Sequence, residues 1–545
     1  MRSMELPRSV VPRSGPEVAV FVSGVSSLGL EILAGRIVAP SFGSSIYTWG
    51  SIIGVFLAAL GYGYHRGGQR AAERASTRAL VIILLGTAAY VAGVLAFAGI
   101  VMEAADAFSV PPRMAPLLPV TLLFGPPVYL LGLISPYAAE LVDADSVGDA
   151  SGRVYALGTI GSIVGAFGTT FLLVPYTSIA VAELGFGLLL VVTAVWLVWR
   201  DRAGGQDRGQ LFLRGFLVVV VLTGGFVVHD NGLALTGDVV ERTQTPYQEL
   251  VVVDRDARAT GDGRTVRTLY LDGTPQSATY LEAGVPVDDE YVFDYTKYFH
   301  LSVVMQDDVD RVLFVGGGGF SGPRRFLAEY PNVTVDVVEL DPAVIAVARE
   351  HFGVGDSPRL NVYEADGREF LADTDRTYDV IVLDAYRKDR VPFHMTTFEF
   401  MELAASHLDD DGVLVANVIS AADGPGSQFY RAQYATLDGA FPHVYAFPTV
   451  GGPVVQNVEL VATKRADGFT RAQLAARIES RDVGVDLDGV ADRYRGPDDV
   501  DTSNVPVLRD GRAPVDRLLD PQLGRRYVIS RNGTVVDDSV ATAAG

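Results

Sequence analysis

Long runs of apolar residues fill most of the first 230 positions of the chain. A helix needs roughly 17–25 such residues to cross the hydrocarbon core of a bilayer. Runs of this kind lie at about 18–39, 46–64, 79–102, 115–135, 154–176, 178–199 and 211–228. Glycine is frequent in them, as it is where transmembrane helices pack closely. The pattern therefore predicts an α-helical transmembrane bundle of about seven helices over residues 1–230, in a multi-pass protein of the cell membrane.

The arginines of the connecting segments predict an orientation. The segment between the second and third runs carries Arg66, Arg70, Arg74 and Arg78, whereas the next segment has only Arg113. Under the positive-inside rule the N-terminus is cytoplasmic. Seven crossings would then put the rest of the chain outside the cell, which we favour slightly. A re-entrant fourth run would put it inside, so the side occupied by the rest of the chain stays open.

Two features interrupt the apolar pattern. Glu31 lies inside the first run, five residues before Arg36. It is either a functional intramembrane acid or one half of an ion pair that holds the bundle together. Pro126 and Pro127 remove backbone donors from the fourth run, so we expect a broken or kinked helix there. A broken helix can mark a transport site, and a simple kink is the favoured alternative.

After residue 230 the apolar runs become short and alternate with polar positions. Strands are predicted at 250–253 and 266–271, within a small β domain at 231–305. Further strands are predicted at 312–315, 333–339, 360–363, 378–383 and 412–419, with helices such as 342–352, 396–408 and 427–440 between them. The last two strands, 443–448 and 457–463, form an antiparallel hairpin at the sheet edge.

This alternation predicts α/β architecture with helices on both faces of a parallel sheet. The expected fold over 306–484 is a Rossmann-type, doubly wound sheet of the class I methyltransferase-like kind. The remaining residues, 485–545, are rich in Asp, Gly and Arg, and are expected to be an acidic, loosely packed extension.

Composition narrows the function classes. The formal net charge is −21, and only three of the 44 basic residues are lysines. Such a halophilic composition is typical of proteins kept soluble in high salt. It argues against a nucleic-acid partner, because no basic stripe is available to neutralise phosphates. The chain has no Cys, which excludes disulfides and thiol catalysis, and its seven His show no metal-ligand spacing.

A glycine turn is the strongest local motif. Strand 312–315 is followed by Gly316, Gly317, Gly318 and Gly319, then by a helix and a second strand that ends at Glu339. In a doubly wound sheet such glycines let the backbone approach a nucleotide, and the acid accepts hydrogen bonds from ribose hydroxyls. A tight turn that needs positive φ is the alternative.

Acids also end two later strands. Asp366, followed by Gly367, and Asp384 lie where ligands bind in open α/β sheets. Asp366 suits an adenine amino group, and Asp384 lies where a reacting group would sit. Any one of these acids could instead cap a helix, but three in succession favour a nucleoside site.

These motifs resemble those of the spermidine synthases, the polyamine aminopropyltransferases, over about 247–465. Tyr247-Gln248, Leu271-Asp272-Gly273 with Gln276, and Asp289-Glu290 resemble the family's Tyr-Gln, LDGxxQ and DE motifs. Gly316 to Gly318 match the start of its GGGDGG, Asp366-Gly367 the end of its GDG, and Asp384 the first Asp of its DSSDP. The whole chain further resembles the membrane-fused members, through Glu31, Arg36, Ser41-Phe42-Gly43, the run at 153–167 and Ala513-Pro514-Val515-Asp516.

The resemblance implies a transferase of polyamine biosynthesis. The implied co-substrate is decarboxylated S-adenosylmethionine, with no tightly bound cofactor and no metal. A primary amine attacks the carbon next to the sulfonium, and methylthioadenosine leaves. Asp384 is implied as the base that deprotonates the amine, helped by Tyr386. The implied donor-binding residues are Gln248, Gly316, Gly317, Gly318, Glu339, Asp366 and Gly367, and the implied acceptor-binding residues are Gln276, Tyr295, Tyr386 and Arg387.

Three departures affect the acceptor side. Gly319 stands where the family has the Asp of GGGDGG, and Arg387 where DSSDP has its second Asp. Phe293-Asp294-Tyr295 replaces a triplet that ends in Glu. Three carboxylates that would hold cationic amines are thus missing, and a cation replaces one of them. Because like charges repel, we expect an altered acceptor site and poor use of putrescine.

Three functions stay open. The first is a membrane-bound aminopropyltransferase-like enzyme with a small-molecule amine acceptor. The second is an S-adenosylmethionine-dependent methyltransferase on another acceptor, where Arg387 and Lys388 would suit an anionic one. The third is a non-catalytic transport or sensor protein that binds an adenosyl ligand or a polyamine. The lipid bilayer is a partner in each case, and whether the chain forms a homo-oligomer is open.

Overall fold

The computed structural model describes residues 12–42, 46–106, 111–143, 146–200, 208–232, 237–256, 263–287, 290–386, 391–481, 483–522, 525, 527–531 and 534–537. The chain divides into two compact units, Met1–Ala234 and Leu235–Gly545. Each unit has its own hydrophobic core.

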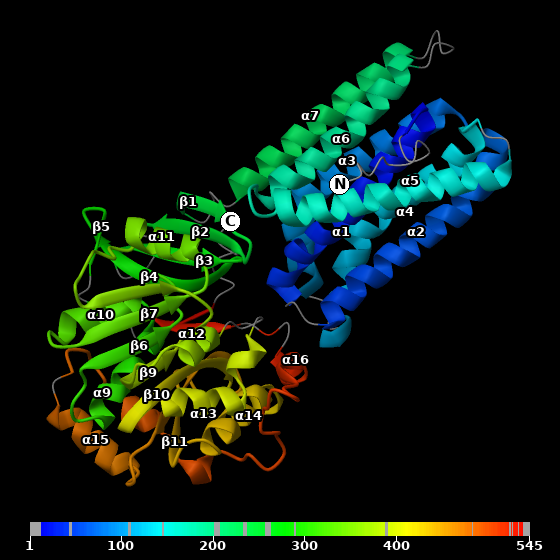
Figure 1. Ribbon diagram of the computed structural model, residues 1–545. Coiled ribbons are helices and arrows are strands. Elements are labelled where there is room, and N and C mark those ends of the chain that lie inside the picture. The colour runs from blue at the N-terminus through cyan, green and yellow to red at the C-terminus, as the bar shows by residue number, and fades with distance from the viewer. Residues whose placement is uncertain are drawn as a thin grey trace, which may run out of the picture. The chain divides into compact units, whose positions relative to one another are not determined.

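The N-terminal unit is built from long apolar helices (Figure 1). They are α1 (Gly15–Phe42), α2 (Ile46–Arg74), α3 (Thr77–Asp106), α4 (Leu117–Leu141), α5 (Val147–Gly168), α6 (Ile179–Arg200) and α7 (Arg208–Gly232). All seven are long and apolar enough to cross a membrane. The predicted apolar runs are therefore helices, as expected of a multi-pass membrane protein.

Glycines allow two pairs of these helices to pack with their backbones in contact. A Cβ atom added at Gly161 of α5 would lie 2.2 Å from the carbonyl oxygen of Phe21 in α1. One added at Gly63 of α2 would lie 2.5 Å from the carbonyl oxygen of Tyr129 in α4. Neither position can hold a larger side chain without moving a helix.

An ion pair joins α5 to the start of α1. Arg153 donates to the carboxylate of Glu17, which also accepts from the backbone N–H of Ser14 at 2.9 Å. The carboxyl side chain of Glu17 is 1% exposed. The suggested pairing of Glu31 with Arg36 in α1 stays a prediction.

The prolines of the fourth run do not interrupt it. Helix α4 continues from Leu117 to Leu141 with Pro126 and Pro127 inside. The helix is therefore not broken, while the favoured alternative of a simple kink, and the crossing of the membrane by the fourth run, stay predictions. Pro126 cannot donate to the carbonyl oxygen of Leu122, four residues earlier. The hydroxyl of Tyr90 in α3 donates to that oxygen instead, at 2.6 Å. A neighbouring helix thus supplies a donor that the proline lacks.

The C-terminal unit begins with an antiparallel sheet. Its strands, in spatial order, are β1 (Asp238–Gln244), β2 (Glu249–Arg255), β3 (Thr265–Leu271), β4 (Thr274–Glu282) and β5 (Val285–Pro286). The sequence predicted only β2 and β3, because β1 and the first half of β4 are mostly polar. Several of their side chains are partly exposed.

The second sheet carries the predicted α/β fold. Its spatial order is β11 (His443–Pro448), β12 (Val455–Thr463), β10 (Leu408–Ala421), β9 (Tyr378–Leu383), β6 (Arg311–Val315), β7 (Thr334–Glu339) and β8 (Leu360–Glu364). From β10 to β8 neighbouring strands are parallel, whereas β12 runs antiparallel to both β10 and β11. The fold class and the antiparallel hairpin are confirmed.

Both faces of this sheet are buried. Along β6, Val312 and Phe314 belong to one apolar cluster, and Leu313 and Val315 to another. Helices that follow the strands, seen in Figure 1, are α10 (Ser321–Glu329), α11 (Pro342–His351), α12 (Gly367–Asp373), α13 (Phe398–Ser406) and α14 (Gln428–Asp438). The strands of the parallel part thus end at one common edge, where Gly316, Glu339 and Asp384 lie.

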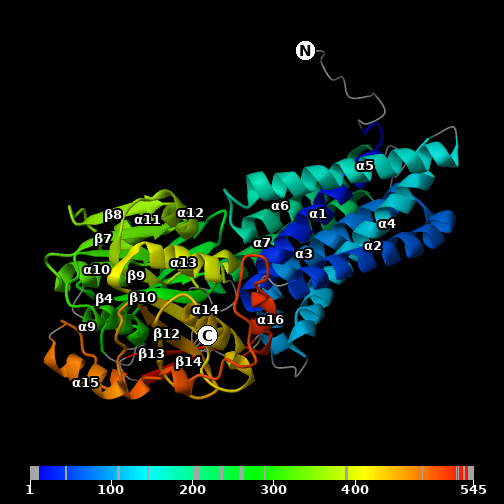
Figure 2. The ribbon, with the colours of Figure 1, turned by 60° about the horizontal axis from the view of Figure 1, so that its bottom comes forward.

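The described part of the acidic extension is packed, contrary to the expectation of a loose tail. Val515, Leu518 and Leu519 of α16 (Val515–Leu519) are buried in one core of the α/β domain. Tyr527 is buried in the other core and forms a β-bridge with Val455 of β12. The strand that follows it, β13 (Val528–Arg531), lies beside β12 (Figure 2). The sequence analysis missed this packing because the apolar residues are scattered among charged ones and form no continuous apolar run.

Candidate active site

A pocket opens at the carboxyl ends of the parallel strands. Its walls come from the glycine turn after β6, the ends of β7 and β9, the inner part of β10 and β12, and residues of β4. It brings together, from the residues singled out above, Gln248, Gln276, Tyr295, Gly316, Gly317, Gly318, Glu339, Asp366, Gly367, Asp384 and Tyr386. Arg387 lies outside the described residues.

The glycine turn has the backbone that its composition predicts. Gly316 has φ +98° and Gly318 φ +49°. A Cβ atom at Gly316 would lie 2.5 Å from the carbonyl oxygen of Asp384. Only glycine combines this φ with such a close approach. The turn thereby runs directly beside the backbone at the end of β9, where Asp384 lies.

Glu339 ties the turn to β7. One carboxylate oxygen accepts from the N–H groups of Gly317 at 2.8 Å and Gly318 at 3.4 Å, and the other accepts from Asp341 at 3.0 Å. Burial raises the pKa of Glu339 above its usual value, although these backbone hydrogen bonds oppose the rise. These hydrogen bonds hold the carboxylate of Glu339 at the pocket wall. Its oxygens can still accept further hydrogen bonds from a ligand.

Asp366 is a helix cap as well as a pocket residue. One carboxylate oxygen accepts from the N–H groups of Arg368 at 2.9 Å and Glu369 at 3.2 Å, at the start of α12. The other pairs with Nε2 of His394 at 2.9 Å. Burial acts to raise the pKa of Asp366, but the hydrogen bonds from His394 and the helix backbone bring it below its usual value. The helix-cap alternative is thus correct here, without removing Asp366 from the pocket.

Gln248 lines the pocket and is held there by Asp341, a residue to which the sequence analysis gave no role. Its amide donates to Asp341 at 3.3 Å, and the same Asp341 oxygen accepts from the hydroxyl of Thr245 at 2.7 Å. Asp341 is buried and caps α11 by accepting from Ala343. Its position two residues after Glu339, at the same strand end, could have indicated that it belongs to the pocket.

Asp384 lies directly after β9, at the floor of the pocket. Its carboxylate accepts from the side-chain amide of Asn417 in β10 at 2.8 Å. Burial raises the pKa of Asp384 to about 7, against the effect of the Asn417 hydrogen bond. A carboxyl group with this pKa can accept a proton near neutral pH.

Tyr386, predicted to help Asp384, and Tyr295, predicted to bind the acceptor, both donate their hydroxyl hydrogens to backbone carbonyl groups. Tyr386 donates to the carbonyl oxygen of Met395 at 2.6 Å, and burial raises its pKa. Tyr295 donates to the carbonyl oxygen of Gln276 at 3.2 Å, and burial raises its pKa as well. Tyr386 thus lines the pocket with its hydroxyl bonded to the backbone, and its help to Asp384 stays a prediction.

A chain of hydrogen bonds continues from Asp384 across the sheet. The side-chain oxygen of Asn417 accepts from the amide of Asn457 at 2.9 Å, and that of Asn457 accepts from the hydroxyl of Tyr527 at 2.7 Å. All three line the pocket. Asn417 and Asn457 could have been found from the sequence, because they are polar residues inside the otherwise apolar strands β10 and β12. Tyr527 belongs to the acidic extension.

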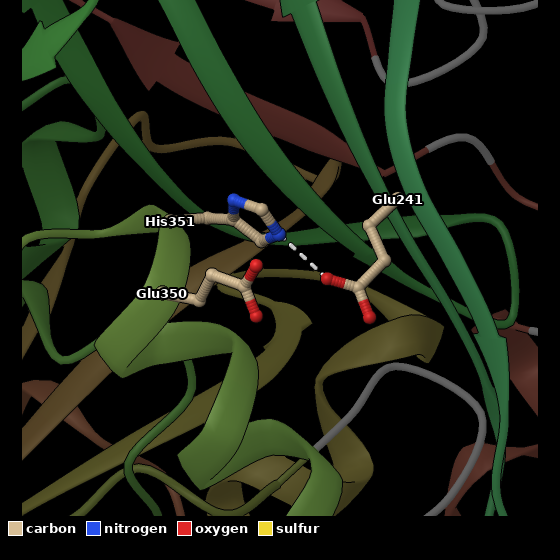
Figure 3. A group of neighbouring side chains, drawn as sticks. All are labelled: Glu241, Glu350 and His351. Atoms are coloured by element: carbon tan, nitrogen blue, oxygen red, sulfur yellow. Dashed lines mark hydrogen bonds and ion pairs between the residues drawn. The ribbon is translucent and has the colours of Figure 1, made fainter.

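A separate group could hold a cation by residue type. Figure 3 shows Glu241 of β1 facing Glu350 and His351 of α11, with one ligand atom of each within 4.8 Å of the others. His351 Nε2 lies 2.5 Å from the Glu241 carboxylate. None of the three lines the pocket. This pair connects the first strand of the small sheet to the end of α11.

The chain is similar to known proteins. The spermine/spermidine synthase domain matches residues 293–421. A probable polyamine aminopropyl transferase of Bifidobacterium longum is 30% identical over 228 residues, which cover 39% of this chain and half of that protein. Polyamine aminopropyltransferase 2 of Ralstonia nicotianae is 27% identical over 467 residues, which cover 80% of this chain and 84% of that protein.

A solved structure, that of a probable spermidine synthase from Corynebacterium glutamicum, covers 50% of this chain and 96% of its own, with 21% identity and a TM-score of 0.41. The two Ralstonia proteins are each similar along 80% of the chain, which is more than the C-terminal unit alone contains. From the domain match and this similarity, the chain belongs to the spermidine synthase, or polyamine aminopropyltransferase, family, with an N-terminal region of seven long apolar helices.

Proposed function

We propose that this chain is a membrane-bound aminopropyltransferase. Its donor is decarboxylated S-adenosylmethionine, and its acceptor is an amine. The amine nitrogen attacks the carbon next to the sulfonium, the carbon–sulfur bond breaks, methylthioadenosine leaves, and the amine loses a proton. The observation that carries the proposal is the Asp384 carboxyl group, with a pKa of about 7, beside the Gly316 turn in one pocket.

The donor half of this pocket suits an adenosyl group. Glu339 is held by the turn with acceptor capacity toward ribose hydroxyls, and Asp366 lies further along the same edge. The positive-φ glycines leave room for a ligand against the backbone. Because the sulfonium is already a good leaving group, the protein contributes mainly positioning and removal of the proton.

The acceptor half supports an altered specificity. At Gly319, where related sequences carry Asp, a Cβ atom would lie 2.7 Å from the Ser277 hydroxyl and 2.9 Å from its Cβ. Ser277 is itself fixed by a hydrogen bond of 2.8 Å to Ser321. A carboxylate therefore has no room at 319 unless β4 moves, and an ammonium group must be bound by other residues.

The direct test uses the full-length chain in detergent or lipid. We expect methylthioadenosine to form from decarboxylated S-adenosylmethionine in the presence of a suitable di- or polyamine, and no product from S-adenosylmethionine itself. Product is measured by mass spectrometry across a panel of amines. Methyl transfer from S-adenosylmethionine, or absence of methylthioadenosine with every amine, would contradict the proposal.

A charge-reversal variant tests the acceptor side. We expect the wild-type protein to use putrescine poorly, and Arg387→Asp to raise kcat/KM for putrescine, because it removes a cation and restores an acid. The matched control is Lys388→Asp, which changes the net charge equally one residue further on. Efficient spermidine formation by the wild type, or equal gains in both variants, would show that Arg387 does not set this specificity.

The side of the membrane is a further prediction. A cytoplasmic N-terminus and seven crossings put the C-terminal unit outside, although adenosyl donors are made in the cytoplasm. The chain has no Cys, so Glu282→Cys, at an exposed position of β4, gives a single label site. We expect an impermeant thiol reagent to label it in intact cells. Glu73→Cys, in the arginine-rich segment after the second run, should label only after lysis. The reverse pattern would place the enzyme inside.

A further inference from the structure

A carboxyl group without a partner lies inside the sheet next to the pocket. Glu459 is 0% exposed in the middle of β12, whose nine residues are all buried. Among the described residues, neither of its carboxylate oxygens has a hydrogen-bond partner. Burying a carboxyl group in this way is unfavourable for folding, and an unsatisfied buried polar group in a native protein calls for an explanation.

The strand register places Glu459 level with the reacting end of the pocket. Glu459 pairs directly with Asn417 of β10, and Asn417 donates to Asp384 at the end of β9. The three side chains share the sheet face of Val415 and Val461. They therefore lie abreast on three neighbouring strands, with the backbones of Asp384 and Glu459 two strand spacings apart, about 10 Å.

The surroundings of Glu459 are polar on the pocket side and lack a described counter-charge. Asn457, two residues earlier on the same face, lines the pocket, as does Asn417. Tyr295 and Tyr298 from the 3-10 helix Asp294–His300 interact electrostatically with Glu459. On the β11 side the paired residue is Phe447, which is apolar.

Burial and the neighbouring Asp384 both favour the neutral form of this carboxyl group. Burial first, and then the negative charge of Asp384, raise the pKa of Glu459 well above its usual value. Arg493 and Asp294 act on Tyr298 rather than on Glu459. A cation placed in the pocket would reverse this balance, because it favours the ionised carboxylate.

We propose that Glu459 supplies the second negative charge of the acceptor site, so that the acceptor is a di- or polyamine. Asp384 faces the attacking amine, and Glu459, which is not itself a lining residue but pairs with the lining residue Asn417, attracts the distal ammonium group. As the ammonium binds, the Glu459 carboxyl group releases its proton to solvent. This inference rests on the proposed transferase function. It gives this chain an acid on the acceptor side, although Gly319 and Arg387 replace two acids of related sequences.

The test compares Glu459→Gln with the wild type. Glutamine imitates the neutral carboxyl group, so the fold should be kept, which thermal unfolding and methylthioadenosine affinity will verify. We expect affinity for α,ω-diamines to fall at least tenfold, and affinity for monoamines of the same length to change little. Glu402→Gln, at an exposed position of α13, removes the same charge away from the pocket and should change neither affinity.

Proton release gives a readout that a purely structural role would not move. Calorimetry of diamine binding in buffers of different ionisation enthalpy should show fewer protons released by Glu459→Gln than by the wild type. Diamine affinity should also rise with pH more steeply in the wild type than in Glu459→Gln, because the proton on the Glu459 carboxyl group competes with the ligand. Unchanged diamine affinity and unchanged proton release in the variant would overturn the proposal. Both readouts measure binding alone, so they distinguish a failure of this inference from a failure of the proposed turnover.

Discussion

Replacing Asp384 by Asn is expected to lower the rate of aminopropyl transfer by about 10²–10⁴-fold, the usual contribution of a general base. The amide keeps the size of the carboxyl group and can still hydrogen-bond to Asn417, which now donates to Asp384 at 2.8 Å. It cannot accept the proton of the attacking amine. Affinity for methylthioadenosine should therefore stay nearly unchanged, because Glu339 and the glycine turn are untouched.

The pH dependence of this rate follows from the pKa of Asp384, which burial raises to about 7. The base is active when ionised, so kcat/KM of the wild type should increase with pH up to about 7 and then level off. The small residual rate of the variant should lack this limb. Tyr386→Phe is the control, because its hydroxyl bonds to the carbonyl oxygen of Met395 and the variant should lose stability rather than the pH limb. A full rate in Asp384→Asn would assign the base elsewhere.

The same raised pKa has a consequence for stability. The folded state holds the Asp384 proton more tightly than the unfolded chain, whose pKa is near the ordinary 3.8. The free energy of unfolding contributed by this group is therefore greatest below that value and decreases as the pH rises toward about 7. In Asp384→Asn, the free energy of unfolding measured between pH 3.8 and about 7 should not show this decrease.

Much of the architecture could be predicted because it depends on local apolar patterning. The transmembrane runs and the strands β6 to β12 are bounded by polar or glycine-containing segments, and their types follow from length and period. The order of Gly316 to Gly318, Glu339, Asp366 and Asp384 could be read because parallel strands end at a common edge. The structure brings these residues into one pocket.

The remaining features depend on contacts between distant segments. Tyr90 satisfies the carbonyl group that Pro126 leaves without a donor, from a helix some 30 residues earlier along the sequence, as the 2.6 Å bond shows. The acidic extension packs because scattered residues such as Leu518 meet a core made elsewhere. Tyr527 reaches the pocket through Asn457, which is 70 residues away in sequence. No periodicity within any of these segments encodes such a partner.

Helix capping also limits what an isolated acid reveals. Asp366 is both a cap of α12 and a pocket residue, so the two readings of its position were not exclusive. Glu459 differs, because the sequence shows an acid inside an apolar strand but the sequence analysis assigned it no function. Its significance depends on the register that places it opposite Asn417.

Removing the carboxylate of Glu339 is expected to weaken methylthioadenosine binding by about 1.5–3 kcal/mol, the range for hydrogen bonds to charged groups. This corresponds to roughly a ten- to hundredfold loss of affinity in Glu339→Ala. The carboxylate lies at the end of β7, accepts from the Gly317 N–H at 2.8 Å, and is the acid available for ribose hydroxyls. Its loss also releases the turn, so the alanine variant measures both effects.

A second variant and a control separate the two contributions. Glu339→Gln keeps an oxygen for the turn but loses the charge, and we expect it to bind methylthioadenosine more tightly than Glu339→Ala and more weakly than the wild type. Glu364→Ala is the control, because Glu364 lies in β8 opposite Glu339 of β7, is exposed, and does not line the pocket. Calorimetry should show wild-type affinity for that control. Wild-type affinity in Glu339→Ala would mean that the adenosyl group binds without the strand-end acid, and the nucleoside assignment of this pocket would be wrong.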